Sequence, residues 1–239
     1  MLSARGLKKR YGKQEVLRGV DMEVDTGAIT AVIGPSGSGK STLLKAMALL
    51  EQPDGGTISI DGAQYVFPGN ELPAPWPKVN IVFQQLFLWP HLTLRQNMEL
   101  PHKERMTTAL KSELDELVSR FSLRPFIDKY PNETSVGQRQ RAALIRALGT
   151  HPKYLLLDEV TSALDIEHVG LVLDYLRELK RKGTSVVLVT HLIQFAAKSA
   201  DRVYFLDQGV VAESGTASIL QSPSSERLQR FLSLAQVAS

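Results

Sequence analysis

One glycine-rich run near the beginning of this chain constrains its structure most, because the run fixes both a local fold and a class of ligand. It matches the pattern G-x-x-x-x-G-K-[ST], in which glycines let backbone N–H groups point at phosphate oxygens. The helix that follows such a loop adds the positive end of its dipole. The run therefore predicts a site for a nucleoside triphosphate. Its candidate residues are Gly34, Pro35, Ser36, Gly37, Ser38, Gly39, Lys40 and Ser41, with Thr42 directly after them.

The residues on either side of this run predict the strand and the helix that the loop requires. Residues 28–33 are apolar and rich in β-branched side chains, which is typical of a short buried strand. Leu43, Met47 and Leu50 then recur at helical spacing, so we expect a helix that begins near Gly39. This strand–loop–helix order places the run in an α/β fold.

Length and composition describe an ordinary globular protein. The 239 residues are 43% hydrophobic, which is enough to bury a core in one large domain or two small ones. The net charge of +3, from 28 basic and 25 acidic residues, is accounted for by nucleotide phosphate. No apolar stretch approaches membrane-spanning length and the N-terminal segment lacks a signal-peptide core, so we expect neither a membrane span nor secretion. The absence of cysteine fits a reducing compartment, and we expect the chain in the cytoplasm.

The rest of the chain predicts further elements of an α/β protein. Residues 57–60 and 64–67 flank an Asp-Gly pair and indicate an antiparallel hairpin. Between residues 86 and 148, apolar side chains recur mostly at helical spacing. Residues 154–157 and 186–189 are short, continuously apolar runs, as a parallel strand buried on both faces needs. Together these patterns predict an α/β fold with a helical insertion.

Two adjacent carboxylates, Asp158 and Glu159, directly follow the first of these apolar runs. Ligands of such sheets bind at the carboxyl ends of the strands, so we expect both carboxylates to face the nucleotide. Lys40 is expected to reach the β and γ phosphates. Asp158 suits Mg²⁺, usually through water, opposite the hydroxyl of Ser41, and Glu159 is free to polarise a water that attacks the γ phosphate. This arrangement predicts hydrolysis.

Residues 134–138 read Thr-Ser-Val-Gly-Gln and precede an apolar-rich segment. They resemble the L-S-G-G-Q signature of ABC-type ATPases and keep three of its five letters. In that family the signature lies about twenty residues before the acidic strand end, and here Gln138 precedes Asp158 by 158 − 138 = 20. The resemblance covers nearly the whole chain, because other family motifs occur in family order. These are Tyr11, Gln84 in Val-Phe-Gln-Gln, Asp165 in Ser-Ala-Leu-Asp, and His191.

The resemblance implies a fold and its division along the chain. It implies an α/β, P-loop NTPase (RecA-like) core with an antiparallel β subdomain and an inserted α-helical subdomain. Residues 1–84 and 150–239 are expected to form the nucleotide-binding core with its β subdomain. Residues 85–149 are expected to form the helical subdomain, which carries the signature.

The resemblance also implies ATP and Mg²⁺ as cofactors and assigns roles to single residues. Tyr11 is expected to stack on adenine, which is worth about 1–3 kcal/mol by analogy with bases stacked on aromatic rings. Glu159, Gln84 and His191 are the implied catalytic residues: Gln84 contacts Mg²⁺ and the attacking water, and His191 contacts the γ phosphate. The implied metal ligands are Ser41, Gln84 and Asp158.

The signature implies a site shared between two subunits. Ser135, Gly137 and Gln138 stand at a helix start, where a hydroxyl and backbone N–H groups bind an anion. In the family that anion is ATP held by the opposite subunit, with Asp165 setting the geometry across the interface. We therefore expect a head-to-tail dimer, either of two copies or with a different ATPase subunit.

Two signature positions depart from the family pattern. Val136 replaces a glycine, and a β-branched residue resists positive φ and keeps neighbouring backbone further from a ligand. Thr134 replaces a leucine, so we expect the loss of an apolar anchor to loosen the loop. Because Ser135 and Gly137 remain, activity is still expected. The hypothesis is slow turnover as a homodimer, or pairing with a subunit that carries an intact signature.

Within the family, residues 83–93 and 190–196 look most like importers of polar amino acids. Lipoprotein and macrolide export ATPases are the alternative transport interpretation. Residues 86–89 are all apolar and either receive a helix of a membrane subunit or pack inside the helical subdomain. The substrate and the role of residues 222–239 stay open.

The expected partners follow from the family. They are an integral membrane permease, a second ATPase subunit and a substrate-binding protein, which places the chain at the cytoplasmic face of the membrane. No nucleic acid is expected, because the chain has neither the inserted coiled coil of chromosome-associated relatives nor the paired units of translation-associated ones. A regulatory subunit that binds ATP with little hydrolysis is a further alternative, for which Val136 is the only argument.

Overall fold

The computed structural model describes residues 1–69, 74–161 and 164–237, and the strands in these residues form two sheets. The smaller sheet is antiparallel, with the order β2-β1-β4-β5. The β4–β5 pair is the predicted hairpin, and its turn residues Asp61 and Gly62 have φ of 52° and 90°. Positive φ at both positions suits a tight hairpin turn. The strands of this sheet are β1 (Leu2–Tyr11), β2 (Gln14–Val24), β4 (Gly55–Ile60) and β5 (Ala63–Phe67).

The larger sheet has the order β10-β9-β3-β8-β7-β6 in the described part of the chain. Neighbours from β9 to β6 are parallel, and β10 is antiparallel to β9 at one edge. β3, β7 and β8 are buried along their whole length, as a parallel sheet covered on both faces requires. The three strands predicted from apolar runs are therefore confirmed. The strands are β3 (Ile29–Ile33), β6 (Val79–Val82), β7 (Tyr154–Asp158), β8 (Ser185–Val189), β9 (Arg202–Asp207) and β10 (Val210–Thr216).

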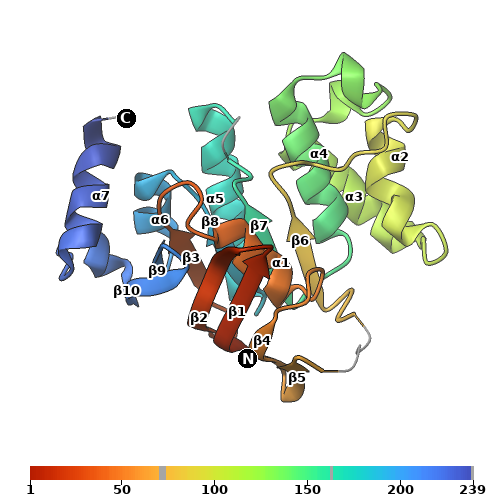
Figure 1. Cartoon of the computed structure of the whole chain (residues 1–239). Helices are drawn as coiled ribbons and strands as arrows, with labels where there is room; N and C mark the ends of the chain where they lie inside the picture. The colour runs from red at the N-terminus through yellow and green to blue at the C-terminus, as the bar shows by residue number, and fades with distance from the viewer. Residues whose placement is uncertain (70–73, 162–163, 238–239) are drawn as a thin grey trace.

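The helices surround the larger sheet, and Figure 1 shows α2, α3 and α4 beyond β6, with α6 and α7 toward the β9–β10 edge. Residues 85–149, all of which are described, contain helices and no strand. The predicted helical character of this insertion is confirmed, whereas its exact boundaries stay a prediction. The α-helices are α1 (Lys40–Met47), α2 (Leu94–Glu99), α3 (Thr108–Arg120), α4 (Val136–Leu148), α5 (Ile166–Arg181), α6 (Ile193–Ser199) and α7 (Glu226–Val237). Short 3-10 helices are η1 (Leu100–His102), η2 (Arg124–Phe126), η3 (Pro131–Glu133) and η4 (Ala217–Leu220).

Helix α1 is shorter than the apolar spacing predicts. Leu43 and Met47 face the core, but α1 ends at Met47 and Leu49 takes a left-handed φ of 54°. Leu50 is 58% exposed beyond this turn, so its assignment to the apolar face of the helix is wrong. The turn breaks the helical period before Leu50 is reached.

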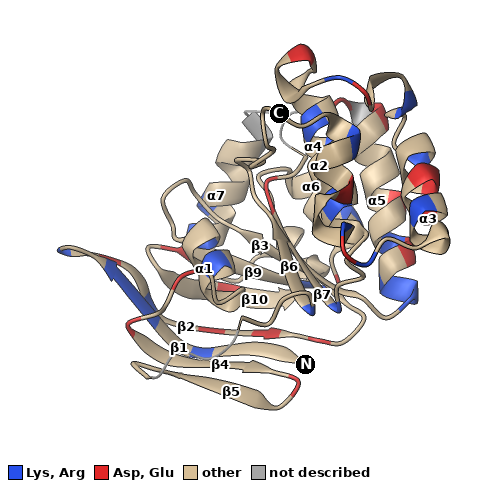
Figure 2. Ribbon diagram, turned by 90° about the vertical axis from the view of Figure 1, so that its right-hand side faces the viewer, with Lys and Arg blue, Asp and Glu red and all other residues tan. Residues whose placement is uncertain are grey.

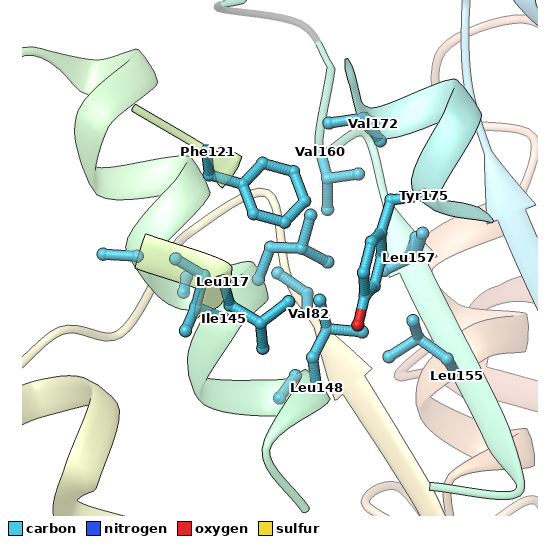
Figure 3. Packing of buried hydrophobic residues seen from close by; sticks show 14 of the residues in the cluster. Val82, Leu117, Phe121, Ile145, Leu148, Leu155, Leu157, Val160, Val172 and Tyr175 are labelled. Carbon is cyan, nitrogen blue, oxygen red and sulfur yellow. The ribbon is translucent and has the colours of Figure 1, made fainter. Parts of the chain in front are cut away.

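A shared apolar core joins the helical group to the larger sheet (Figure 3). Phe121, which follows α3, and Leu148, at the end of α4, meet Val82 of β6 and Tyr175 of α5 in this core. The rings of Phe121 and Tyr175 lie 5.5 Å apart with an edge-to-face inclination of 66°. Apolar burial therefore fixes where the helical group sits against β6.

Charged side chains lie mainly outside this core. Figure 2 shows Lys, Arg, Asp and Glu on the outer helices and on the smaller sheet, while the strands of the larger sheet are mostly uncharged. Among the described residues, no helix combines the length and the apolar character needed to cross a bilayer.

Asp61, in the hairpin turn of the smaller sheet, links that sheet to the larger one. Its Oδ1 accepts hydrogen bonds from Lys153 Nζ at 2.8 Å and from Tyr154 Oη at 2.6 Å, and Lys78 Nζ lies 3.6 Å from Oδ2. The bonds from Lys153 and Tyr154 lower the pKa of Asp61, although partial burial opposes them. The charged carboxylate thus stabilises the junction between the two sheets.

We predict that Asp61→Asn lowers the free energy of unfolding at pH 7 by about 1–3 kcal/mol, as expected for bonds to a charged group. Asparagine tolerates the left-handed φ, so the change isolates the charge. Because the folded pKa of Asp61 lies below the unfolded value of about 3.9, its contribution is complete above that pH and is lost below it. Urea unfolding of both proteins from pH 7 to pH 3 should show the difference shrinking below about pH 4.

The matched control is Asp174→Asn, because Asp174 pairs with Arg177 at 3.2 Å on the surface of α5 and is 67% exposed. It should change the free energy of unfolding by less than about 0.5 kcal/mol. An equal effect of both changes, or a constant difference across the pH range, would contradict the assigned role of Asp61.

Candidate nucleotide site

The candidate site lies where the parallel strands of the larger sheet end. The predicted phosphate loop follows β3, Gln84 follows β6, Glu159 follows β7 and His191 follows β8. These segments surround a cavity of about 400 Å³. The lining residues are Tyr11, Gln14, Val16, Ser36, Gly37, Gly39, Lys40, Ser41, Thr42, Gln84, Glu159 and His191.

The phosphate loop needs glycine at its two ends for steric reasons. Gly34 has φ of 150°, and a Cβ there would lie 2.0 Å from the Leu206 carbonyl oxygen. Gly39, directly before α1, has φ of 104°, and a Cβ there would lie 2.8 Å from the Val16 carbonyl oxygen. The loop therefore approaches neighbouring backbone as closely as only glycine allows.

Lys40 is held inside the loop by backbone carbonyls. Its side chain is nearly buried, and Nζ donates to the carbonyl oxygens of Gly34 and Pro35, both at 2.9 Å. Burial lowers the pKa of Lys40, while Glu159 and Asp158 act to raise it. The ammonium group is thus held at the mouth of the loop. Phosphate oxygens are stronger acceptors than these neutral carbonyls, so a bound phosphate would take over the hydrogen bonds of Lys40.

Asp158 and Ser41 form the oxygen pair that the sequence predicts for Mg²⁺. Asp158 is 4% exposed, and its Oδ1 has no hydrogen-bond partner among the described residues. Burial raises the pKa of Asp158, and a hydrogen bond with the Ser41 side chain acts in the opposite direction. An unpaired buried carboxylate oxygen beside a hydroxyl suits a hard cation such as Mg²⁺.

Both carboxylate oxygens of Glu159 are engaged by the two other predicted catalytic residues. Gln84 Nε2 donates to Oε2 at 2.9 Å, and His191 Nε2 lies 2.5 Å from Oε1. Glu159 has a left-handed φ of 52°, an uncommon conformation for this residue that costs about 1–3 kcal/mol. The backbone N–H of Glu159 donates to the Val189 carbonyl at 3.0 Å, which helps to hold this conformation.

Tyr11 stands at the rim of the cavity, at the end of β1. The residue is 47% exposed, its hydroxyl bonds to Glu51, and Lys9 Nζ lies 5.6 Å from the ring centre. Gln14 and Val16 line the same cavity, and the sequence analysis missed both. The signal that could have identified them is their place on β2, the strand that returns directly from Tyr11.

The signature residues line a different cavity. Ser135 caps α4: its Oγ accepts from the Gln138 N–H at 3.2 Å, and Gln138 Oε1 accepts from the Ser135 N–H at 2.9 Å. The structure therefore does not bring Ser135, Gly137, Gln138 or Asp165 to the phosphate loop of their own chain. All of them except Gln138 line a cavity of about 190 Å³, whose lining residues are Ser135, Val136, Gly137, Arg141, Leu164, Asp165 and His168.

The structure corrects the physical reasons given for the two signature departures. Val136 is the first residue of α4, is absent from the residues with positive φ, and is 47% exposed, so it causes no backbone strain here. Thr134 is buried, and its Oγ1 donates to the Pro131 carbonyl at 2.9 Å. Expecting Thr134 to loosen this loop is therefore wrong, because a hydrogen bond replaces the apolar anchor.

Asp165 caps the start of α5. Its Oδ1 accepts from the His168 N–H at 2.9 Å and lies 2.6 Å from His168 Nδ1. The bond from the His168 backbone, followed by that from its ring, lowers the pKa of Asp165. The predicted motif begins with Ser162 and Ala163, and these two residues lie outside the described part of the chain.

Comparison with known proteins identifies the family of this chain. The model of the family described as ABC transporter matches residues 17–162. The arginine transport ATP-binding protein ArtM of Bacillus subtilis is 40% identical, with 97% of this chain and 98% of that protein covered. The glutamine transport ATP-binding protein GlnQ of Escherichia coli is 39% identical, with 97% and 98% covered.

Solved structures show the same fold. A dimeric ATP-binding cassette in a post-hydrolysis state with ADP and Pi has a TM-score of 0.82 and 31% identity over 91% of this chain and 99% of that one. An ATP-binding subunit of an ABC transporter has a TM-score of 0.84 and 26% identity, with 99% of both chains covered. The P-loop NTPase core with an antiparallel β subdomain and a helical insertion is thereby confirmed. The chain belongs to the ABC transporter family and is one of its ATPases.

Proposed function

We propose that this chain hydrolyses ATP to drive uptake of polar amino acids through a separate membrane permease. The observation that carries the hydrolytic part is the Glu159 carboxylate, held beside the phosphate loop by Gln84 and His191. The amino-acid part rests on relatives at about 40% identity that are named for transport of arginine, cystine, glutamine and glutamate. An export ATPase of the lipoprotein or macrolide type remains the alternative.

Each residue around the nucleotide cavity would have its own role in hydrolysis. Backbone N–H groups of the loop and Lys40 would hold the β and γ phosphates, with Tyr11 against the adenine ring. Glu159 would accept a proton from the attacking water, oriented by Gln84, and His191 would contact the γ phosphate. Gln84 and His191 each engage a different oxygen of Glu159, and each oxygen keeps a second lone pair with which it would accept a hydrogen bond from the attacking water.

Mg²⁺ would bind between Ser41 and Asp158, with Gln84 as a further ligand. When bound, it would neutralise charge on the β and γ phosphates. Within the described residues, no cluster of three or more His, Cys, Asp or Glu side chains is placed to hold a metal. Most of the coordination would therefore come from phosphate oxygens and water, as is usual for Mg²⁺ at nucleotide sites.

We propose a head-to-tail dimer with this chain or a different ATPase subunit. The separation of the signature cavity from the nucleotide cavity supports this, because Ser135, Gly137 and Asp165 line a cavity that shares no residue with the nucleotide cavity. The known dimeric cassettes of the same fold are consistent with it. The helical subdomain, residues 85–149, would then present the signature to the partner.

The permease would dock on the apolar surface of the helical group. Phe87 and Trp89 are 57% and 52% exposed, whereas Leu86 and Leu88 pack inward against the core. Interior packing therefore describes Leu86 and Leu88, while Phe87 and Trp89 stay available for the proposed docking. A groove of about 340 Å³ between α2 and Met106 offers room for side chains of a permease helix at the cytoplasmic face of the membrane. A substrate-binding protein would complete the importer.

We predict that Glu159→Gln abolishes ATP hydrolysis while preserving ATP binding, because the amide keeps the shape but cannot accept the proton. The turnover number should fall by about 10²- to 10⁴-fold. Steady-state ATPase assays of the assembled complex, nucleotide-binding titrations and uptake of radiolabelled polar amino acids in cells that carry the variant would measure this. Uptake should be lost together with hydrolysis.

The matched control is Glu116→Gln, an exposed glutamate on α3, which should leave both activities unchanged. Equal background hydrolysis by wild type and Glu159→Gln would favour the regulatory subunit that binds ATP without turnover. Loss of a secreted product with normal amino-acid uptake would favour the export system.

We predict that Asp158→Asn raises the Mg²⁺ concentration for half-maximal ATPase activity by about 10- to 100-fold, because a neutral amide replaces a charged oxygen donor. Titration of Mg²⁺ at saturating ATP would measure this, and chelation should abolish activity of the wild type. Asp174→Asn on α5 is the matched control. An unchanged Mg²⁺ requirement in Asp158→Asn would exclude Asp158 from the metal site.

We predict that Val136→Gly increases the turnover number of the assembled complex, because removing the exposed side chain lets the partner's nucleotide approach α4 more closely. The turnover number should rise about fivefold, which corresponds to a change of about 1 kcal/mol in a binding contact. The melting temperature should fall slightly, since glycine is less favourable in a helix. An unchanged ATPase rate would refute the idea that Val136 limits closure.

A further inference from the structure

Arg146, near the end of the signature helix α4, holds the loop that carries Gln84. Its Nη1 donates to the Phe87 carbonyl and its Nη2 to the Leu86 carbonyl, both at 2.9 Å. Burial lowers the pKa of Arg146. The two guanidinium branches therefore grip two successive carbonyls of one loop, a geometry that a single ammonium group cannot reproduce.

The same loop has a second clamp on α2. Asn97 is fully buried; its Oδ1 accepts from the Trp89 N–H at 2.7 Å, and its Nδ2 donates to the Trp89 carbonyl at 3.1 Å. Nδ2 also donates to the carbonyls of Leu92 and Thr93, each at 3.0 Å. The loop is thus fixed to α4 on one side of Trp89 and to α2 on the other.

Gln84 lies two and three residues before the carbonyls that Arg146 holds, and its side chain bonds to Glu159. A displacement of Leu86 and Phe87 would therefore move Gln84 relative to the carboxylate. Phe83 and Phe87 stiffen this short connection, because their rings meet edge to face at 5.2 Å between centres.

Helix α4 connects this clamp to the signature. Ser135 caps its first turn, and Arg146 follows 146 − 135 = 11 residues later, about three helical turns away. Rigid secondary-structure elements of this kind are among the structures that carry coupling between distant sites. Contact between the signature and a nucleotide on the partner would therefore reach the loop of Gln84 through Arg146.

We infer that Arg146 is a positioning residue that couples the signature end of α4 to Gln84, and so links the two nucleotide sites of a dimer. The inference rests on the proposed ATPase function and its shared sites. Arg146 would set neither the affinity for ATP nor the cleavage of the γ phosphate directly, since it lines neither the nucleotide cavity nor the signature cavity. Removing the Arg146 side chain should leave nucleotide binding intact and uncouple the loop that carries Gln84 from the signature.

The two tryptophans of the chain, Trp76 and Trp89, allow a direct test, because Trp89 lies in the clamped loop. Trp76→Phe leaves Trp89 as the only tryptophan, and Glu159→Gln in the same protein prevents turnover. ATP should then change the Trp89 emission. Adding Arg146→Met should weaken the coupling equilibrium by about 2- to 30-fold and so reduce that change, while the Kd of a fluorescent ATP analogue stays within about twofold.

Hydrolysis by the assembled complex provides a second readout. In a background that retains Glu159, Arg146→Met should lower kcat by the same factor and leave KM for ATP unchanged. Arg146→Lys keeps the charge but not the two-pronged grip, and should recover only part of kcat. Arg181→Met, on the exposed end of α5, is the matched control and should leave kcat and the Trp89 signal unchanged.

The possible results separate the inference from the proposed function. If the parent protein with Arg146 does not bind ATP, the ATPase proposal fails, and the inference fails with it. If ATP binds but the Trp89 change is absent in the parent, or equally large in Arg146→Met, only the role of Arg146 is refuted. A parallel rise in KM and fall in melting temperature, with equal loss in Arg146→Lys, would show a merely structural contribution.

Discussion

The parallel pairing of β3, β8, β7 and β6 is the constraint on which the rest of the structure depends. Parallel strands point their carboxyl ends to one edge, so four separate segments of the chain meet there. Three of them follow β3, β7 and β8, which are apolar because both faces of the sheet are covered, and the fourth follows the edge strand β6. Burial of these strands thereby assembles Lys40, Gln84, Glu159 and His191 around one cavity.

The sequence predicts best what is encoded locally. The strand before the phosphate loop, the hairpin around Asp61 and the run ending in Asp158 each carry their own pattern, and the structure contains all three. The hydrogen bond from Gln84 to Glu159 spans 75 residues and depends on β6 being the neighbour of β7, which no local pattern specifies. Only the family resemblance pointed to Gln84.

Local reasoning also failed where context changes the meaning of a residue. A valine in a glycine position suggests strain, yet Val136 occupies the first turn of a helix, where its φ is ordinary. A threonine in a leucine position suggests a lost contact, yet Thr134 gains a hydrogen bond to a backbone carbonyl. The left-handed turn at Leu49 was likewise unmarked, because leucine rarely adopts it. In each of these three residues, the surrounding structure set the conformation or the contacts that the residue type alone did not indicate.

The double engagement of Glu159 has a consequence for the resting subunit. With Gln84 on one oxygen and His191 on the other, the carboxylate proposed to accept a proton from water is held in one orientation. Each oxygen keeps one lone pair for a water, so the proposed base would need no rearrangement of its own side chain. The rate of ATP use would then depend on how the nucleotide and the partner subunit place that water.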